Sequence, residues 1–301
     1  MSGKVRVMIL DLLAERPEFG HGGNQEIISP IAEYCDLEIL LVTPQFQTEE
    51  IGERSQSEGI VGISENDVPA WDDGFEFWEE CSLEISGNNV KFNRIAMPLH
   101  GDDQRTVEWL ELVRPDAVIC SGSRRNVTMW EEWMEGGASL VRSSAQMGIP
   151  TLGICFGHQL LCKALGSSLE RADSLSNGVW DLELTDVGRS DFLFSTRGSG
   201  RDGSPIVLFT HQDHVITVPE CCELLASTSH NAVTAVRVHG EDGDPLPSWG
   251  VQFHPEAAKA RVERAFEGGY ISEEELVEFS KDHDGAGILE TFASVVMENI
   301  V

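Results

Sequence analysis

One cysteine in the sequence stands where a catalytic nucleophile would be expected. A largely apolar run from Ile149 to Ile154 leads to Cys155, which is flanked at a distance of two residues by Gly153 and Gly157. This pattern is typical of a nucleophile elbow, a sharp turn from a strand into a helix that exposes the reactive side chain. The positive end of the following helix favours the thiolate, which is the reactive form of cysteine. The sequence therefore predicts acyl-transfer chemistry at Cys155.

Cysteine acyl chemistry also needs a nearby base and a third group that orients this base. We favour His254 as the base because it ends the strand-like run Trp249–Phe253, and functional groups gather at the carboxyl ends of strands in open α/β sheets. Glu256 follows two residues later and could hold the imidazole in the required tautomer. The other candidates for the base are His211, His214, His230 and His239.

The pattern of apolar residues indicates which elements would position these groups. Strand-like runs are expected at Val5–Leu10, Leu37–Val42, Ala117–Cys120, Val179–Leu184, Ile206–Phe209, Glu223–Ser227 and Ala232–Val238, with a hairpin within Cys81–Met97. Helices are expected at Ile27–Tyr34, Asp103–Val113, Ala138–Met147, Phe156–Leu165 and Gly287–Ile300, with a loop at Glu15–Asn24 and a capping box from Ser272 to Glu275. The alternation of strands and helices predicts an α/β fold, with an open, mostly parallel sheet flanked by helices.

The domain organisation follows from what the sequence lacks. It contains no internal repeat and no Pro/Ser-rich linker, so we expect a single domain over residues 1–301. Residues 45–73 are polar, acidic and weakly periodic, which indicates an insertion that extends over about 45–103. A C-terminal extension is expected over about 257–301.

Charge and composition exclude several classes of partner. The 301 residues include 51 acids and 21 bases, a formal net charge of −30, which repels nucleic acid and anionic membranes. No apolar run approaches the roughly 18 residues of a membrane span. The acidic surface is typical of solubility or of a salt-rich cytoplasm, and a basic partner protein is the alternative.

Cysteine usage and the first residues predict a cytoplasmic location. The seven cysteines have no regular spacing, which fits a reduced compartment. The chain passes quickly from Met1 into an apolar run and then to Asp11 and Glu15, which is typical of a first strand and not of a signal peptide.

Together these motifs resemble the class I, triad-type glutamine amidotransferases, in particular the stand-alone, GMP-synthase-like glutaminase domains. The resemblance rests on Gly153–Gln159 and on Gln252–Glu256. Arg114–Gly122 is similar to the family's oxyanion strand and loop, and Thr210–Asp213 with Val218–Pro219 is similar to its Ser-His-x-Asp…Pro segment. The likeness covers about 116–256 well and the first strands loosely.

The resemblance implies a flavodoxin-like fold and hydrolysis of the side-chain amide of glutamine through a glutamyl-thioester. Its catalytic residues would be Cys155, His254 and Glu256. Backbone N–H groups of Phe156, Gly122 and Ser123 would hold the oxyanion. Substrate contacts would come from Gln159, His211, Gln212 and Asp213. Outside the family pattern, Arg124 lies next to the predicted pocket and is a further candidate, for binding a substrate carboxylate. No cofactor or metal is implied, since His211, His214, Cys221 and Cys222 do not match a zinc-site spacing.

Two segments depart from the family pattern. Ser121-Gly122-Ser123-Arg124 replaces the usual Ser-Gly-Gly-Pro of the oxyanion loop, and a serine in place of glycine restricts the backbone there. Ser176-Asn177-Gly178 stands where Glu-x-Gly is common, so recognition of glutamine could be altered. The sequence contains no Gly-x-x-x-x-Gly-Lys-Ser/Thr loop and no synthetase-like Ser-Gly-Gly-x-Asp-Ser segment.

Three functions remain open on the sequence. The first is a stand-alone glutaminase that passes ammonia to an unidentified synthetase on a separate chain. The second is a γ-glutamyl hydrolase that acts on a γ-glutamyl amine or peptide without a partner, which the altered oxyanion loop and the neighbouring Arg124 and Arg125 make credible. The third is a non-catalytic regulatory protein on the same fold, against which the complete triad argues.

Overall fold

A ten-stranded sheet forms the centre of the molecule. The computed structural model describes residues 4–13, 17–44, 82–98 and 100–300. The strand order is β3-β4-β2-β1-β5-β6-β12-β11-β10-β8, and from β4 to β12 in this order the strands run parallel. The strands are β1 (Val5–Leu10), β2 (Leu37–Thr43), β3 (Ser82–Ile85), β4 (Asn88–Ala96), β5 (Ala117–Cys120), β6 (Thr151–Ile154), β8 (Glu183–Leu184), β10 (Cys222–Thr228), β11 (Asn231–His239) and β12 (Pro245–Val251). A second sheet pairs β7 (Leu169–Asp181) with β9 (Ile206–Val215).

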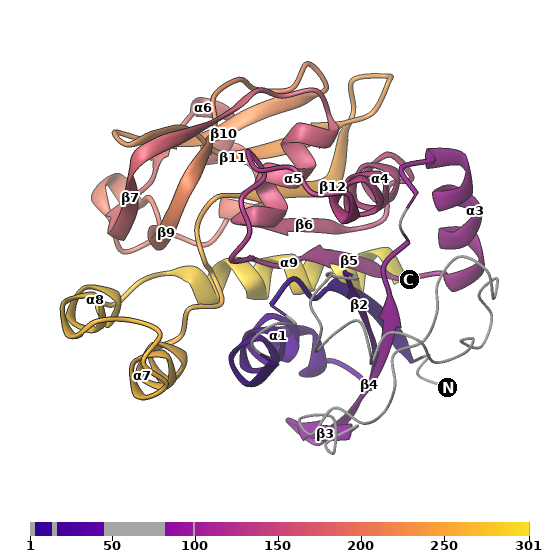
Figure 1. The fold of residues 1–301 in the computed structure, drawn as a ribbon, viewed down its shortest axis with the longest axis horizontal. Coiled ribbons are helices and arrows are strands. Elements are labelled where there is room, and N and C mark those ends of the chain that lie inside the picture. Colours follow the sequence, from indigo (N-terminus) through magenta and orange to yellow (C-terminus); the bar gives the residue numbers. More distant parts are fainter. Residues whose placement is uncertain (1–3, 14–16, 45–81, 99, 301) are drawn as a thin grey trace.

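Helices cover both faces of the central sheet. The helices of the described residues are α1 (Pro17–Ala32), α3 (Asp103–Val113), α4 (Trp133–Gln146), α5 (Phe156–Ala164), α6 (Asp186–Ser190), α7 (Lys259–Glu267), α8 (Glu273–Phe279) and α9 (Gly285–Ile300). Helices α4 and α5 pack on one face with α3 beside α4, whereas α1 and α9 lie side by side on the other (Figure 1). The predicted α/β class, an open and mostly parallel sheet flanked by helices, is confirmed.

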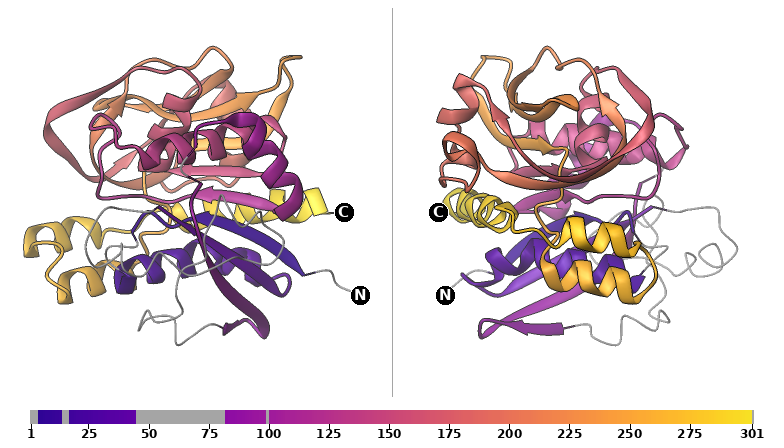
Figure 2. Two further views of the ribbon diagram at one scale, coloured as in Figure 1. Left: turned by 45° about the vertical axis from the view of Figure 1, so that its right-hand side comes forward. Right: turned by 90° about the vertical axis from the view of Figure 1, so that its left-hand side faces the viewer.

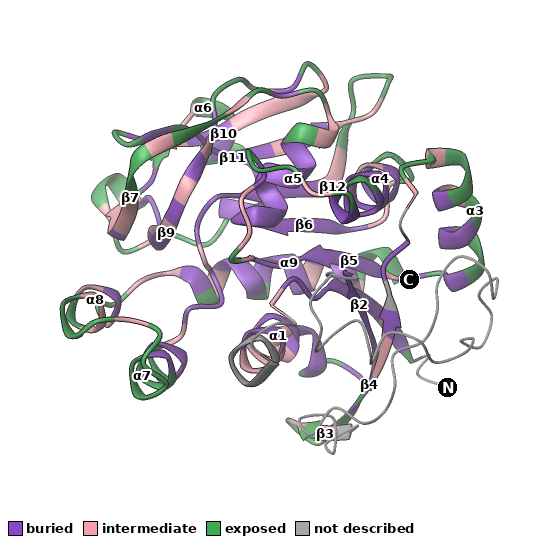
Figure 3. Cartoon of the chain, in the orientation of Figure 1, coloured by how far each residue is buried: buried purple, intermediate pink, exposed green. Residues whose placement is uncertain are grey.

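The central strands are buried on both faces, as expected of parallel strands covered by helices. Every residue of β5 and of β6 is buried, and Figure 3 shows the same burial across the middle of the sheet. Continuous apolar runs therefore marked these strands in the sequence. The predicted bounds of β1, β5 and α3 are those of the structure, and the predicted hairpin is formed by β3 and β4.

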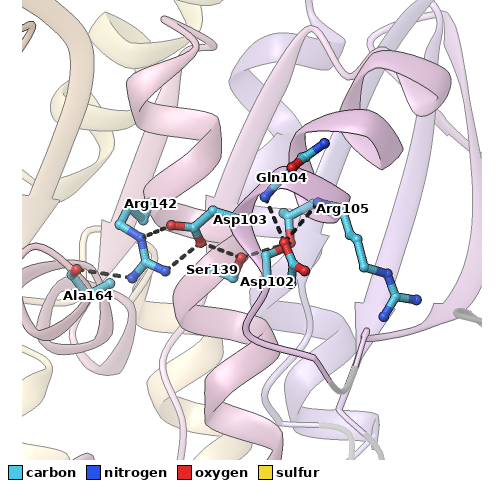
Figure 4. Close-up of polar contacts among 8 residues, drawn as sticks. Asp102, Asp103, Gln104, Arg105, Ser139, Arg142 and Ala164 are labelled. Carbon is cyan, nitrogen blue, oxygen red and sulfur yellow. Dashed lines mark hydrogen bonds and ion pairs between the residues drawn. The ribbon is translucent and has the colours of Figure 1, made fainter.

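Polar contacts hold α3, α4 and α5 together, as Figure 4 shows. Asp102 caps α3 by accepting hydrogen bonds from backbone N–H groups of its first turn. Asp103 accepts hydrogen bonds from Nε of Arg142 at 2.9 Å and from Oγ of Ser139 at 2.7 Å, both on α4. Arg142 also donates to the carbonyl of Ala164, at the end of α5, at 3.1 Å. These contacts fix the helix that follows the predicted nucleophile.

The loop predicted at Glu15–Asn24 is wrong from residue 17 onward, because α1 begins at Pro17. The glycines that suggested a loop instead allow close packing of helices. A Cβ atom at Gly23 would lie 1.8 Å from Nη1 of Arg261 on α7. Glycine at this position makes room for a guanidinium group, at the cost of helix propensity.

Other elements begin earlier or extend further than the sequence indicated. Helix α4 begins at Trp133 instead of Ala138, β7 begins at Leu169 instead of Val179, and β9 continues to Val215. The added parts of β7 and β9 carry polar residues and pair with each other. Hydrophobic periodicity is weak in such segments, so it did not reveal them.

The expected insertion and extension are partly described. Residues 45–81 lie outside the described part of the chain, whereas β3 and β4 within the expected insertion continue the central sheet beside β2. In the C-terminal extension, the predicted capping box between Ser272 and Glu275 opens α8. Helix α9 packs against α1, while α7 and α8 stand together beside the body of the fold (Figure 2). No helix in the described ranges is long and apolar enough to cross a membrane.

Candidate active site

Cys155 lies in the turn between β6 and α5, with backbone angles φ 50° and ψ −101°. This conformation is strained for any residue other than glycine, and strain of this kind clusters at functional sites. The flanking glycines allow close contact between neighbouring elements. A Cβ atom at Gly157 would lie 2.1 Å from the carbonyl oxygen of Cys120, and one at Gly153 would lie 2.6 Å from that of Gly157. The sequence folds here into a nucleophile elbow.

The parallel pairing of β12 with β6 brings His254 to the elbow. Val251 at the end of β12 pairs with Ile154 at the end of β6, so the residues that follow both strands emerge at one edge of the sheet. The loop after β5, on the other side of β6, reaches the same place. A Cβ atom at Gly122 would lie 3.0 Å from Cε1 of His254 and 4.0 Å from Cβ of Cys155.

Glu256 holds the imidazole of His254. Its Oε1 atom lies 2.9 Å from Nδ1 of His254, and both side chains are mostly buried, with exposed fractions of 3% and 15%. Burial opposes the charged form of His254, but the negative charges of Cys155 and Glu256 outweigh it and raise the pKa of His254 well above its ordinary value. Burial likewise opposes the charge of Glu256, but His254 and then Arg261 lower the pKa of this carboxyl.

Nε2 of His254 faces the nucleophile without a well-formed hydrogen bond. It has no partner of full hydrogen-bonding geometry among the described residues, but both the charge of Cys155 and its side-chain interaction with the ring raise the pKa of His254. The Sγ atom of Cys155 lies 3.9 Å from the carbonyl oxygen of Thr210 on β9. The charged form of His254 and the N-terminus of α5 thus bring positive potential to the sulfur.

Arg261 is a contributor that the sequence did not reveal. It lies on α7, in the C-terminal extension, and its Nη1 atom is 3.8 Å from Oε1 of Glu256. Its side chain is only 8% exposed, so the interaction is weakly screened. Arg261 follows Glu256 by 5 positions and has no recognisable motif around it. The sequence therefore does not indicate that the two side chains lie close together.

Charge coupling between His254 and Glu256 predicts a pH-dependent stability. The contribution of Glu256 is present above its ordinary pKa of 4.5 and is lost as pH falls, because its pKa is lowered on folding. The contribution of His254 is full below its ordinary pKa of 6.5 and is lost as pH rises, because its pKa is raised. The difference in unfolding free energy between wild type and Glu256→Gln is therefore expected to be largest between about pH 4.5 and 6.5. Urea unfolding across pH 3.5–9 would measure it, and a difference that grows steadily toward low pH would contradict the pairing.

The predicted oxyanion loop is held in place by its serines. Oγ of Ser121 donates to the carbonyl of Leu10 at 2.8 Å. Oγ of Ser123 donates to the carbonyl of Leu12 at 3.2 Å and accepts from the N–H of Arg125 at 3.1 Å. The serine that replaces a glycine therefore ties the loop to the segment after β1. Phe156 is the first residue of α5, where N–H groups have no acceptor within the helix.

All the predicted site residues line one cavity of about 440 Å³, which we call the Cys155 cavity. This volume is within the range of small-molecule sites. The cavity is lined by Cys155, His254, Glu256, Phe156, Gly122, Ser123, Gln159, His211, Gln212, Asp213 and Arg124, together with residues of α7 and α8.

Three of the predicted substrate contacts have polar atoms that are engaged within the protein. Nε2 of Gln159 donates to the carbonyl of Asp213 at 2.8 Å. The Asp213 carboxylate accepts from the N–H of Thr128 at 2.8 Å and pairs with Arg171 at 3.2 Å. Gln212 donates to the carbonyl of Ala172 at 2.8 Å. These side chains build the wall of the cavity.

His211 and Arg124 have polar groups that remain open to a ligand. Both ring nitrogens of His211 lack hydrogen-bond partners among the described residues, although the residue is only 6% exposed. Burial, with a contribution from His214, lowers the pKa of His211 to about 3, so the ring is neutral. Arg124 is exposed at the cavity rim, and its guanidinium makes no hydrogen bond or ion pair with residues in the described ranges. No group of three His, Cys, Asp or Glu side chains in those ranges is arranged to hold a metal ion.

Comparison with known proteins identifies the family of the chain. The family described as "Glutamine amidotransferase class-I" matches residues 81–266. The chain therefore belongs to the class I glutamine amidotransferases, enzymes that hydrolyse a C–N amide bond with a cysteine nucleophile.

Two relatives with similar sequences are much longer than the part of them that this chain matches. The chain is 32% identical over 155 residues to a glutamine-hydrolyzing GMP synthase of Staphylococcus epidermidis, a match that covers 52% of this chain and 27% of that protein. It is 29% identical over 199 residues to the corresponding Staphylococcus aureus protein, covering 66% of this chain and 34% of that protein. The chain thus spans about a third or less of the length of these relatives.

Two solved structures share the fold over nearly their whole length. The glutaminase domain of Trypanosoma brucei CTPS with bound acivicin superposes with a TM-score of 0.54 at 14% identity, covering 98% of this chain and 94% of that one. A Thermoplasma acidophilum protein described as a GMP synthase subunit superposes with a TM-score of 0.52 at 14% identity, covering 99% and 96%. At this identity the likeness supports the flavodoxin-like fold alone.

Proposed function

We propose that this amidotransferase hydrolyses the side-chain amide of glutamine through a triad of Cys155, His254 and Glu256. The observation that carries the proposal is the convergence of three sheet strands: β5, β6 and β12 end at one cavity that contains a strained cysteine and a carboxylate-bound histidine. Nucleophile, base and orienting acid are the elements that cysteine acyl chemistry requires.

In the first half-reaction, the Cys155 thiolate attacks the carboxamide carbon of glutamine. The negative charge that develops on the oxygen is held by backbone N–H groups of Phe156 and of the Gly122–Ser123 turn. His254, which is protonated in the resting site, gives its proton to the nitrogen as the C–N bond breaks, and ammonia leaves. A glutamyl-thioester on Cys155 remains.

In the second half-reaction, water releases glutamate from the thioester. Formation of the thioester removes the negative charge of the sulfur, one of the two charges that raise the pKa of His254. The imidazole can then lose its proton and accept one from the attacking water. Glu256 keeps Nδ1 of His254 protonated and stabilises the imidazolium when it forms again.

We further propose that Arg124 binds the α-carboxylate of the substrate, because it is a cationic group at the rim of the cavity without a partner in the described residues. Arg124→Ala is expected to raise KM for glutamine by roughly 10- to 100-fold and to change kcat by less than about threefold, since the lost contact is made equally in ground and transition states. Steady-state glutamate release would measure both constants. Arg189→Ala, on the exposed surface of α6, is the control, and an unchanged KM in Arg124→Ala would exclude this contact.

Ammonia is proposed to pass to an acceptor synthetase on a separate chain. The proposal draws on the names of the similar proteins, one of which is described as a subunit of GMP synthase, and on the limited part of the longer relatives that the chain matches. Glutamate and ammonia release from glutamine, measured with the full chain alone and with cell extract, tests the function. Equal inactivity of wild type and Cys155→Ala under both conditions would rule it out.

A further inference from the structure

One wall of the Cys155 cavity is apolar and comes from the C-terminal extension. Val262 and Ala265 on α7, and Phe279 on α8, line it together with Ile271 between the helices and Leu208 on β9. Val262, Ala265 and Phe279 are only about 5% exposed, and Val262 and Phe279 belong to a small hydrophobic cluster of their own with Leu208. We call this set of five residues the apolar wall.

The apolar wall lines the same cavity as His254 and comes from helices that follow it closely in the chain. A general acid must stand within hydrogen-bonding distance of the atom that it protonates, so the leaving nitrogen lies beside His254. The chain continues from His254 through Glu256 and Ala257 directly into α7. Ala257 itself lines the cavity and packs in the same cluster as Val262. A substituent on the leaving nitrogen would therefore extend toward α7 and α8.

Polar contacts outside the wall hold α8 against the cavity. Asn177 on β7 donates from Nδ2 to Oε1 of Glu275 at 3.0 Å, and the N–H of Val179 donates to Glu278 at 3.3 Å. Oε2 of Glu275 accepts from the N–H of Ser272 in the capping box at 2.9 Å. Both oxygens of the Glu275 carboxylate, which borders the wall, thus accept hydrogen bonds from within the protein. The segment that departs from the family's Glu-x-Gly pattern serves as the anchor of α8.

Ammonia gains little from an apolar surface, whereas a hydrocarbon substituent gains free energy in proportion to the area that it buries. We propose that the Cys155 cavity accepts γ-glutamyl amides of apolar amines, with an aliphatic or aromatic substituent against the apolar wall, and turns them over more efficiently than glutamine. This inference rests on the proposed function, because it uses the same nucleophile and proton donor. The sulfur–carbon bond forms, the carbon–nitrogen bond breaks, and His254 supplies the proton with which the free amine leaves. Water then completes the hydrolysis to glutamate.

The test compares glutamine with the γ-glutamyl amides of methylamine, ethylamine, propylamine and butylamine, using the full chain. Each methylene that is buried against the wall is expected to raise kcat/KM by about fourfold, so butylamide should exceed methylamide by several tens of fold. The γ-glutamyl amide of 1,4-diaminobutane, which ends in a charged group, is expected to lose most of this gain.

Variants test whether the preference for the butylamide over glutamine depends on the apolar wall. Val262→Thr keeps the side-chain shape but adds a hydroxyl group to the wall, and it is expected to lower the ratio of kcat/KM for butylamide over glutamine by roughly three- to tenfold. Val277→Thr is the matched control, because Val277 lies on α8 but is 68% exposed and does not line the cavity. The ratio in this control should equal that of wild type.

The outcomes separate this inference from the function on which it rests. Glutamine turnover with a kcat/KM that is flat or falls from methylamide to butylamide would overturn the inference and leave the glutaminase proposal standing. A rise that is identical in Val262→Thr would also overturn it, because the substituent would then bind elsewhere. Absence of glutamate release from every γ-glutamyl compound would overturn both proposals together.

Discussion

Replacement of Cys155 by alanine is expected to lower kcat for glutamate release from glutamine by about 10⁴- to 10⁶-fold, the range lost when the nucleophile of a triad is removed. The reason is that no other thiol or hydroxyl on the described residues that line the cavity stands at the strained elbow, facing both His254 and the oxyanion loop. Steady-state assays of glutamate and ammonia would measure the loss. An electrophile that mimics glutamine should label the wild type covalently and leave the variant unlabelled.

Cys162→Ala is the matched control for this prediction. Cys162 lies on the same helix, α5, is fully buried and contacts Nδ1 of His158 at 3.7 Å, away from the cavity. Its replacement is expected to lower the free energy of unfolding by about 1 to 2 kcal/mol, with kcat within about twofold of wild type. If Cys155→Ala retained a tenth of the wild-type kcat while folded, the assignment of the nucleophile would be wrong.

Glu256→Gln is expected to lower kcat by about 10³- to 10⁴-fold, because an amide cannot hold His254 in the same tautomer or stabilise its charged form. The same change is expected to cost about 3 kcal/mol of stability. It removes a negative charge from beside the buried guanidinium of Arg261, and the loss of one partner from a buried pair is strongly destabilising. Enzyme kinetics and urea unfolding would measure the two effects separately.

Glu263→Gln serves as the control. Glu263 is an exposed carboxylate on α7, and in the sequence it lies between Arg261 and Arg264, which pack near α1. Its kcat and stability should match those of wild type within about twofold and 0.5 kcal/mol. A further measurement distinguishes chemistry from structure. If Glu256 acts only through folding, Glu256→Gln at temperatures where it is fully folded would regain the wild-type kcat and pH profile, and the triad assignment would fail.

The sequence predicted those features that short stretches encode. Continuous apolar runs marked β1, β2 and β5 because parallel strands covered by helices have no polar face. The glycines around Cys155 marked the elbow because the close approach of α5 to β5 excludes any Cβ atom at Gly157. The positions of Cys155, His254 and Glu256 at one cavity were predicted from motifs that each follow a strand.

Longer-range features could not be predicted in this way. The glycines of α1 predict a loop when the sequence is considered alone. The contact that explains Gly23 is with Arg261, which lies far along the chain. In the polar parts of β7 and β9, residues 169–178 and 210–215, pairing depends on the register between the two strands, and neither part has an apolar period that marks it as a strand. Both features follow from contacts that no local pattern records.

The sequence by itself thus determined the class of fold, the elbow and the types of residue at the site. Only the tertiary structure decided how they are placed: the register of β12 on β6 brings His254 to Cys155, and α7 carries Arg261 under Glu256. It also decided that α8, anchored on the Ser176–Val179 segment of β7, places Phe279 in the wall of the cavity. The physical reason is that local propensity and periodicity act over a few residues, whereas these contacts form between elements that lie far apart in the sequence.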